Sequence, residues 1–313
     1  MKILVTGTAG FIGLQLAKAL SDAGHEVLGV DKRENTSSQW LETRVADLAN
    51  WDQVKDLGKF DAIYHMAGHS AGDLSIEFYE EDIKDNLLST AHIIKLAKET
   101  GASQIIHASS MAVYGDQPKY PVSEGAEPMP RVYYGANKLA AEYYLKISND
   151  ESLDTTSIRL FNIYGPGQDV NNLTQGMVSI FVGELIINKH FEMRGSPDRY
   201  RDFLYIDDTV EGLVQCLGNK KIKGEVINMG SGVTHTLGQL LDKIRERLPF
   251  ETTVSYTNPT SFDLNRMHAD ISKARELLGF NPKFTLDAGL DRMIEWVLSG
   301  NDLAINHTND ATK

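Results

Sequence analysis

The chain has 313 residues, of which 42% are hydrophobic and 24% charged, a balance typical of a soluble globular protein with one large domain or two smaller ones. The chain has 31 lysine and arginine residues and 43 aspartate and glutamate residues, which gives a formal net charge of -12. This charge disfavours nucleic acid as a partner, because proteins bind nucleic acid by neutralising its phosphates. No apolar run reaches the length of a membrane span, the N-terminus lacks the regions of a signal peptide, and the single cysteine suits a reducing compartment, so we expect a cytoplasmic protein.

Short apolar runs alternate with longer helical patterns through the first half of the chain. The runs at 2–6, 26–30, 62–67 and 104–109 are nearly continuously apolar, as in strands that are covered on both faces. We expect strands at 2–6, 26–30, 62–67, 104–109 and 155–161, and helices at 11–23, roughly 50–57, roughly 77–100 and 132–149. Alternation of this kind predicts an α/β fold with a Rossmann-type doubly wound parallel sheet.

The pattern becomes less regular after the strand at 155–161, where "YGPGQ" interrupts the chain. We predict a dinucleotide-binding domain over 1–163, with part of 203–230 returning to its sheet. Residues 164–202 and 231–313 are expected to form mainly a smaller, mixed α/β substrate-binding lobe. The polar C-terminal stretch 301–313 is expected to fray.

A glycine-rich turn follows the first strand. "VTGTAGFIG" places Gly7, Gly10 and Gly13 where a backbone can approach a pyrophosphate at the N-terminus of a helix. The second strand ends in Asp31, where a carboxylate can accept hydrogen bonds from the adenosine ribose and disfavours a 2′-phosphate. NAD is therefore favoured over NADP, although Lys32 and Arg33 could pair with such a phosphate.

Tyr134 and Lys138 stand four residues apart in "RVYYGANKLAAEYY", which places them on one face of the expected helix. A spacing of this kind arises by chance in many chains, so its meaning depends on the rest of the sequence. An ammonium near a phenol favours the phenolate and so lowers the pKa of the phenol, which is near 10 in water.

Several segments together resemble the extended short-chain dehydrogenase/reductase group, the NAD-dependent epimerase/dehydratase enzymes of nucleotide sugars. They are "TGTAGFIG" (6–13), "ADL" (46–48), "HMAG" (65–68), "SSMAVYGD" (109–116), "YGANK" (134–138), "RLFNIYGPG" (159–167), "RDFLYIDD" (201–208) and "ADISKARELLGFNP" (269–282). The resemblance implies that Tyr134 is the general base, that Lys138 lowers its pKa and holds the nicotinamide ribose, and that Ser110 binds the reacting hydroxyl. Ser109 is the structural serine on this interpretation, although chemistry alone does not separate the two serines.

The resemblance also implies a set of residues that bind NAD. They are Gly7, Gly10, Phe11, Ile12 and Gly13 at the pyrophosphate, Asp31 at the ribose, Asp47 and Leu48 at the adenine, and Met66, Ala67 and Gly68 at the turn that ends the strand at 62–67, together with Tyr134 and Lys138. No cluster of Cys, His and acidic residues has the spacing of metal ligands, so no metal is expected.

The substrate implied is a nucleotide-diphosphate sugar. The resemblance assigns to it Ser110, Tyr134, Asn162, Asn172, Leu173, Arg194, Arg201 and Arg266. Guanidinium groups suit a diphosphate because their donors form a fork that matches phosphate oxygens. Many 4-epimerases have a second phosphate-binding arginine at a place that Thr260 occupies here; Arg266 is its candidate replacement.

The reaction class follows from the residues after Ser110. Sugar 4,6-dehydratases of the family carry Asp-Glu there, whereas this chain has Met111 and Ala112, which are neither acid nor base. The chain is thus similar to the NAD-dependent 4-epimerases. The alternatives are net oxidation or reduction at C4, dehydration by the same family, or a non-catalytic NAD-binding sensor or assembly protein. Relatives pair the helices equivalent to 77–100 and 132–149, which implies a homodimer, although these apolar residues could equally face the protein's own sheet.

Overall fold

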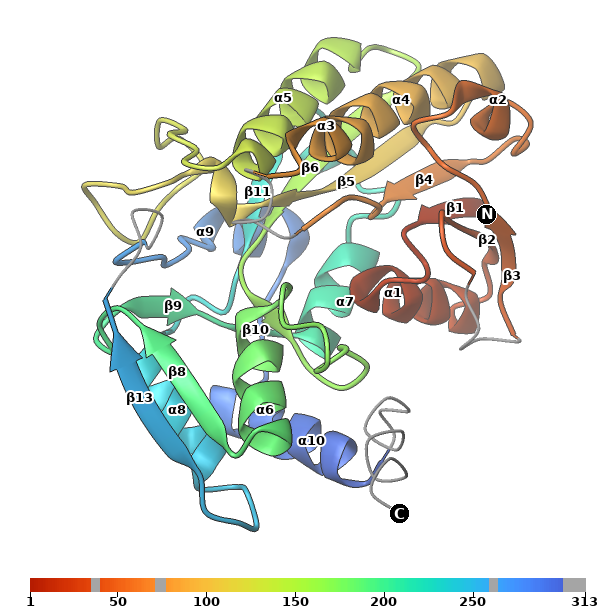
Figure 1. Cartoon of the computed structure of the whole chain (residues 1–313). Helices are drawn as coiled ribbons and strands as arrows, with labels where there is room; N and C mark the ends of the chain where they lie inside the picture. Colours follow the sequence, from red (N-terminus) through yellow and green to blue (C-terminus); the bar gives the residue numbers. More distant parts are fainter. Residues whose placement is uncertain (35–39, 71–76, 259–263, 301–313) are drawn as a thin grey trace.

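A computed structural model describes residues 1–34, 40–70, 77–258 and 264–300 (Figure 1). The predicted strands and helices of the first half alternate as expected and form one parallel sheet of seven strands, in the order β11-β6-β5-β4-β1-β2-β3. Its strands are β1 (Lys2–Thr6), β2 (Glu26–Asp31), β3 (Glu42–Val45), β4 (Ala62–His65), β5 (Gln104–Ser110), β6 (Asp154–Leu160) and β11 (Val226–Met229). The Rossmann-type doubly wound sheet is therefore confirmed.

Helices cover both faces of this sheet. One face carries α2 (Trp51–Val54), α3 (Tyr79–Asp82), the π-helical segment η2 (Ile83–Leu88), α4 (Ser89–Thr100) and α5 (Tyr133–Ser148). The other carries α1 (Phe11–Asp22), α7 (Ile206–Val214) and α9 (Ser272–Leu278). The buried side chains of α4 and α5 pack on one face, and those of α1 and α7 pack on the other, so the sheet is enclosed as its apolar strands predict.

Three elements differ from the expectation. The edge strand β3 was not predicted, because "ETRV" is polar and mostly exposed and so shows no apolar run. The helix expected at 77–100 contains the π-helical η2 between α3 and α4. The strand expected at 62–67 ends at His65, since the chain turns there toward the glycine-rich loop.

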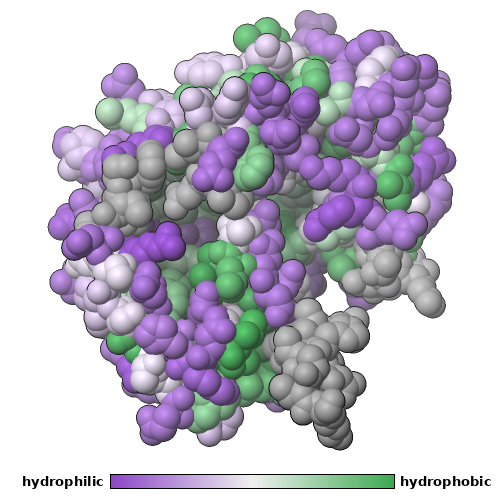
Figure 2. All heavy atoms as spheres, in the orientation of Figure 1, coloured by the Kyte–Doolittle hydropathy of each residue, from purple (hydrophilic) through white to green (hydrophobic). Residues whose placement is uncertain are grey.

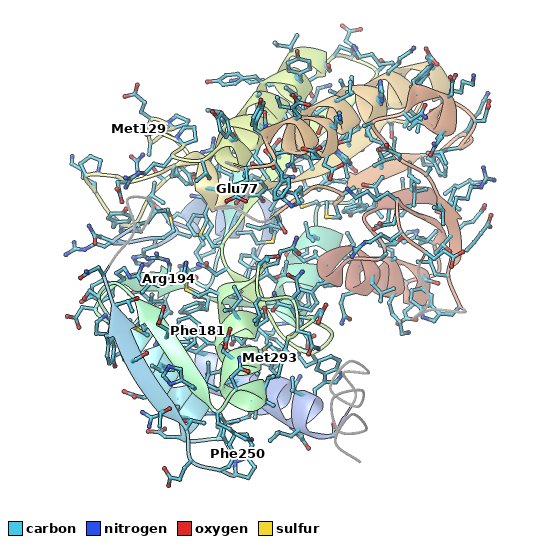
Figure 3. The ribbon with its side chains drawn as sticks, in the orientation of Figure 1. Glu77, Met129, Phe181, Arg194, Phe250 and Met293 are labelled. Carbon is cyan, nitrogen blue, oxygen red and sulfur yellow. The ribbon has the colours of Figure 1, made fainter. Side chains whose placement is uncertain are left out.

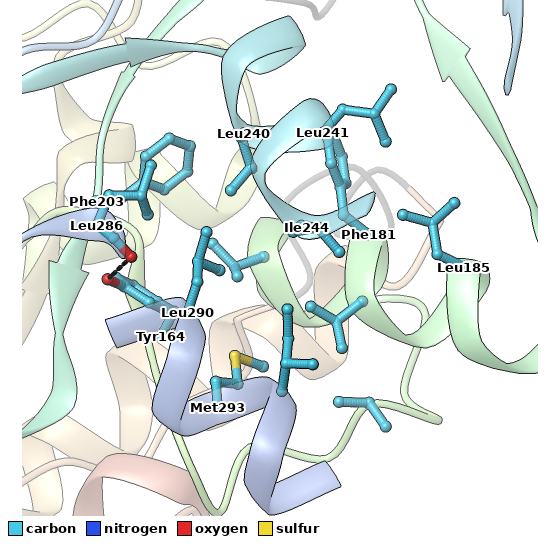
Figure 4. Close-up of a cluster of buried hydrophobic side chains, with 14 of the residues drawn as sticks. Tyr164, Phe181, Leu185, Phe203, Leu240, Leu241, Ile244, Leu286, Leu290 and Met293 are labelled. Atoms are coloured by element: carbon cyan, nitrogen blue, oxygen red, sulfur yellow. Dashed lines mark hydrogen bonds between the residues drawn. The ribbon is translucent and has the colours of Figure 1, made fainter. Parts of the chain in front are cut away.

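The remaining elements build a second lobe, drawn below the sheet in Figure 1. They are β7 (Ile163–Tyr164), α6 (Met177–Ile187), β8 (His190–Arg194), β9 (Tyr200–Asp202), β10 (Leu204–Tyr205), β12 (Thr234–Thr236), α8 (Leu237–Arg245), β13 (Thr253–Thr257) and α10 (Leu286–Leu298). Its core gathers side chains from α6, α8 and α10, including Phe181, Leu241 and Met293; the Tyr164 hydroxyl donates to the Leu286 carbonyl at 3.3 Å (Figure 4).

The chain passes between the two lobes more than once. β11 lies beside β6, α7 packs on α1, and α9 contacts β11 although it follows most of the second lobe in sequence. We propose the division into a dinucleotide-binding domain and a substrate-binding lobe predicted above, with α9 counted with the sheet. The expected fraying of 301–313 and the position of Thr260 lie outside the described residues.

The visible face in Figure 2 is largely hydrophilic, and its hydrophobic side chains gather mainly on the second lobe, over the region of α6. In the described part of the chain, no helix combines the length and apolarity needed to cross a membrane. Nor do the described residues contain a group of three or more His, Cys, Asp or Glu side chains that could hold a metal ion.

Candidate active site

The glycine-rich turn brings β1, α1 and the end of β4 together. Gly7 has φ +77, and a Cβ there would lie 2.8 Å from the Ala67 nitrogen and 2.9 Å from the Met66 carbonyl carbon. A Cβ on Gly13 would lie 2.2 Å from the Gly7 oxygen. Gly10 is the N-cap of α1, whose first turn contains no acidic residue. Only glycine permits these approaches, and a helix that begins directly after such a turn offers N–H groups that suit an anion such as a pyrophosphate.

Asp31 ends β2 beside this turn. Its carboxylate accepts hydrogen bonds from the backbone N–H groups of Ala9 and Arg33, both at 3.0 Å. Lys32 is paired with Asp85 of η2 at 2.5 Å, and Arg33 donates to the Ala9 carbonyl at 3.1 Å. Both cations next to Asp31 are thus engaged within the protein, which weakens the argument that they serve a 2′-phosphate.

The other expected cofactor residues lie around the same edge of the sheet. Phe11 and Ile12 are half-buried and reach the core of the second lobe. Asp47 is exposed, whereas the Leu48 side chain is buried under α4, so only its backbone could reach an adenine. Met66 and Ala67 are half-buried; the Ala67 N–H donates to the Thr6 hydroxyl at 3.0 Å, and this fixes the turn that ends at the exposed Gly68.

The three expected catalytic side chains meet at the end of β5. Gly135 lets α5 approach the short 3₁₀ helix η3 (Met111–Val113), since a Cβ there would lie 2.4 Å from the Ala112 oxygen. This close packing brings Tyr134 to Ser110, and the two side chains form a hydrogen bond. The Lys138 ammonium lies 5.9 Å from the centroid of the Tyr134 ring and donates to the Ala108 carbonyl at 2.9 Å.

Burial dominates the acid–base properties of this group. It raises the pKa of Tyr134 to about 12, although the Ser110 hydrogen bond acts to lower it and the Asp82 carboxylate raises it further. Burial lowers the pKa of Lys138 to about 8, against Asp82 and Glu142, which raise it. Burial is thus the largest influence on both groups, and it favours the neutral phenol and the neutral amine.

The polar side chains behind Lys138 were not identified from the sequence. His65 and His107 are fully buried and stacked with ring centroids 5.6 Å apart, and burial lowers the pKa of His65 to about 3, so His65 is neutral at physiological pH. Glu142 forms a bidentate pair with Arg159 at 2.9 and 2.7 Å and also accepts from Ser109. The contact supports the structural role expected for Ser109. Only the spacing of Glu142, one turn after Lys138, hinted at this network.

The expected substrate residues lie on the second lobe and its connections. Asn162 has φ +35 and donates to the Asp202 carbonyl at 2.7 Å. Asn172 and the exposed Leu173 lie in the loop before α6, where the Asn172 side chain accepts from the Thr174 N–H at 3.1 Å. This contact helps to hold the loop in shape.

The three arginines have different surroundings. Arg194 is exposed at the carboxyl end of β8, on the side of the second lobe nearest the sheet (Figure 3). Arg201 is 5% exposed and donates to the carbonyls of Tyr200 and Leu264, both at 2.8 Å. Arg266 is exposed, lies 5.8 Å from the Tyr200 ring centroid and lines a pocket of about 540 Å³. Arg194 and Arg266 are thus the more accessible of the three.

Comparison with known proteins places this site in a family. The model of the NAD dependent epimerase/dehydratase family matches residues 3–230. A UDP-glucose 4-epimerase of Mycolicibacterium smegmatis is 32% identical to this chain, over 95% of this chain and 98% of the epimerase. UDP-glucuronic acid decarboxylase 1 of Xenopus tropicalis is 31% identical, over 94% of this chain and 72% of the decarboxylase. The structure of a Thermotoga maritima UDP-glucose 4-epimerase with UDP-glucose superposes with a TM-score of 0.91 at 27% identity, covering 96% of this chain and 100% of that one.

These relatives include enzymes with different net reactions, while the glycine cradle and the Asp31 carboxylate fit the cofactor that the family shares. The chain belongs to the NAD-dependent epimerase/dehydratase family and uses NAD.

Proposed function

We propose that the protein is a nucleotide-sugar 4-epimerase. The observation that carries the proposal is the Ser110–Tyr134–Lys138 group at the end of β5, followed by Met111 and Ala112 in η3. The first three residues suit oxidation of a hydroxyl. The next two offer no acid or base for elimination of water, which favours a reaction confined to C4 over dehydration.

The residues proposed to hold NAD are the glycines of the first turn at the pyrophosphate, Asp31 at the ribose, and Lys138 beside Gly68. Bound NAD supplies a hydride acceptor, a hydride donor and, in its oxidised form, a positive charge. That charge opposes the desolvation that raises the pKa of Tyr134. The Tyr134 phenolate then takes the proton of the C4 hydroxyl, and Ser110 holds the hydroxyl oxygen. The 4-keto sugar turns over in the pocket before Tyr134 returns the proton.

The substrate-binding residues are part of the same proposal. The exposed Arg194 and Arg266 suit the diphosphate. Arg201 instead supports the nearby backbone, because its guanidinium donates to the carbonyls of Tyr200 and Leu264. Asn162, Asn172 and Leu173 are proposed to line the path of the nucleotide. The relatives' names make UDP the first nucleotide to test.

The experiment incubates the protein with UDP-, GDP-, dTDP- and CDP-sugars and separates the C4 isomers. The proposal expects interconversion with no net change in NADH. Accumulation of a 4-keto sugar with stoichiometric NADH would instead show net oxidation, and CO2 release from UDP-glucuronic acid would show decarboxylation, the reaction named for a relative that is 31% identical. NAD binding without turnover of any sugar would indicate a sensor.

We also propose a homodimer formed through α5 and the helical stretch opposite it. Ala141 and Leu145 face the sheet, whereas Tyr143, Tyr144 and Ile147 on the same helix are 55%, 49% and 82% exposed. Ile83 and Leu88 of η2 are 43% and 38% exposed. Sedimentation at micromolar concentration is expected to show a dimer that Ile147→Asp dissociates; a monomeric wild type would reject this proposal.

A further inference from the structure

Asp82 is a buried carboxylate without a role in the chemistry described so far. It ends α3, and its exposed fraction is 0%. Its Oδ2 accepts from Asn137 Nδ2 at 2.6 Å, and its Oδ1 accepts from Asn86 Nδ2 at 2.8 Å. Both donors are neutral amides, so they solvate the charge without balancing it. A buried charge of this kind is costly unless an opposite charge lies near it.

Lys138, a buried cation with a proposed role in the chemistry, lies on the helix that α3 packs against (Figure 1). A Cβ placed on Gly68 would lie 2.4 Å from Asn86 Oδ1 and 2.9 Å from Lys138 Nζ. The amide that donates to Asp82 and the ammonium therefore approach the same point of the proposed cofactor site. Asn86 Oδ1 is buried and has no hydrogen-bond partner in the described structure.

The second carboxylate near Lys138 already has its own counter-charge. Glu142 is one turn further along α5, and both of its oxygens are held by the Arg159 guanidinium, with each side chain 4% exposed. Glu142 and Arg159 thus form a closed pair. Asp82 and Lys138 remain as the second pair of opposite charges in the same buried region.

The other ionisable groups around Lys138 do not replace Asp82. His65 on β4 and His107 on β5 are kept neutral by burial, which lowers the pKa of each. His69 Nδ1 lies 3.5 Å from Asp82 Oδ1 but carries charge only when protonated. On η2, Lys84 is exposed, and the half-buried Asp85 is paired with Lys32. Tyr134 is the remaining ionisable group beside the ammonium on α5.

We infer that Asp82 is the buried counter-charge of Lys138, a positioning residue that keeps the ammonium protonated and directed at the cofactor site. The inference rests on the roles proposed for Tyr134 and Lys138. It has an electrostatic corollary: Asp82 opposes the effect of burial on the pKa of Lys138 and also raises the pKa of Tyr134. Removing the charge should therefore shift both titrations to lower pH.

The test compares Asp82→Asn with Asn137→Ser, which removes a hydrogen bond to the same carboxylate but leaves its charge. The dissociation constant of NAD is measured by calorimetry between pH 6 and pH 10. In Asp82→Asn, the midpoint of the alkaline loss of affinity is expected to move down by about one pH unit, which weakens binding about tenfold at pH values above both midpoints. Asn137→Ser should weaken binding without moving the midpoint. An unmoved midpoint in folded Asp82→Asn, or an equal shift in both variants, would overturn the inference.

Thermal unfolding of Asp82→Asn, Lys138→Met and the double variant provides a second measurement. Removal of Asp82 should lower the melting temperature less in the Lys138→Met background than in the wild type, because the cation it balances is then absent. If Asp82→Asn alone is unfolded, recovery of folding by the double variant would likewise support a charge interaction between Asp82 and Lys138. Additive losses, or failure of both to fold, would show that Asp82 acts only through the amides. Neither readout depends on a sugar, so failure of the epimerase proposal and failure of this inference are distinguishable.

Discussion

Replacing Tyr134 by Phe removes one hydroxyl from the proposed site and leaves the ring that packs α5 against η3. The structural loss is the hydrogen bond with Ser110, and a bond of this kind contributes about 0.5–1.5 kcal/mol to stability. The burial that raises the pKa of Tyr134 favours the neutral side chain, so Phe is well tolerated. Lys138 keeps its bond to the Ala108 carbonyl. The variant should therefore fold and bind NAD.

The rate should fall much further than the stability. General acid–base catalysis contributes about 10²–10⁴-fold, and Tyr134 is the proposed base, so turnover should drop by at least about 10²-fold. The assay follows C4 isomers of the best nucleotide sugar, with NAD affinity measured in parallel. Tyr256→Phe, at an exposed tyrosine of β13 outside the proposed dimer surface, is the matched control and should keep wild-type turnover. Nearly full activity in folded Tyr134→Phe would refute the reasoning.

Three further predictions concern stability and cofactor binding. Because burial lowers the pKa of Lys138 to about 8, the unfolded chain binds more protons than the folded one between about pH 8 and the ordinary value of 10.5. The free energy of unfolding of the wild type, relative to that of Lys138→Met, should thus rise by about 3 kcal/mol across this window and stay level below pH 8. Denaturant unfolding at a series of pH values measures this difference. A difference that does not depend on pH would contradict the buried ammonium. Arg159→Met leaves the buried Glu142 carboxylate without its cation and should lower the free energy of unfolding by about 3–5 kcal/mol. Lys18→Met, which breaks an exposed pair with Asp22, should lower it by less than about 1 kcal/mol. Equal melting temperatures for the two variants would contradict this. Gly13→Ala forces a methyl against the Gly7 carbonyl and should abolish detectable NAD binding by calorimetry, while Gly125→Ala, where a Cβ meets only the Ser123 Oγ at 3.9 Å, should bind normally.

The sequence was most informative where function depends on local spacing. The glycines of the first turn, Asp31 at the end of β2 and the Tyr134–Lys138 spacing are patterns within one element or one connection, and the structure brings these residues to one edge of the sheet. Ser110 and Tyr134 belong to different elements, and it was the resemblance to a family that paired them.

The parts that could not be predicted arise from packing between distant elements. In the sequence, nothing distinguishes Asp82 from the neighbouring acids Glu80, Glu81 and Asp85. Its burial follows from the packing of α3 against α5. Arg159 lies in the fully buried strand β6, and its partner is 17 residues earlier. The raised pKa of Tyr134 likewise follows from burial, which no spacing in the sequence expresses.

In the proposed reaction, the protein inverts C4 by removing hydride there and returning it. NMR of the product formed in D2O from an unlabelled nucleotide sugar distinguishes this route from proton exchange at carbon. The expected product has an inverted C4 whose hydrogen is still protium, because Tyr134 exchanges only the hydroxyl proton with solvent. Deuterium on C4 or C5 of the product, or conversion without inversion at C4, would contradict it.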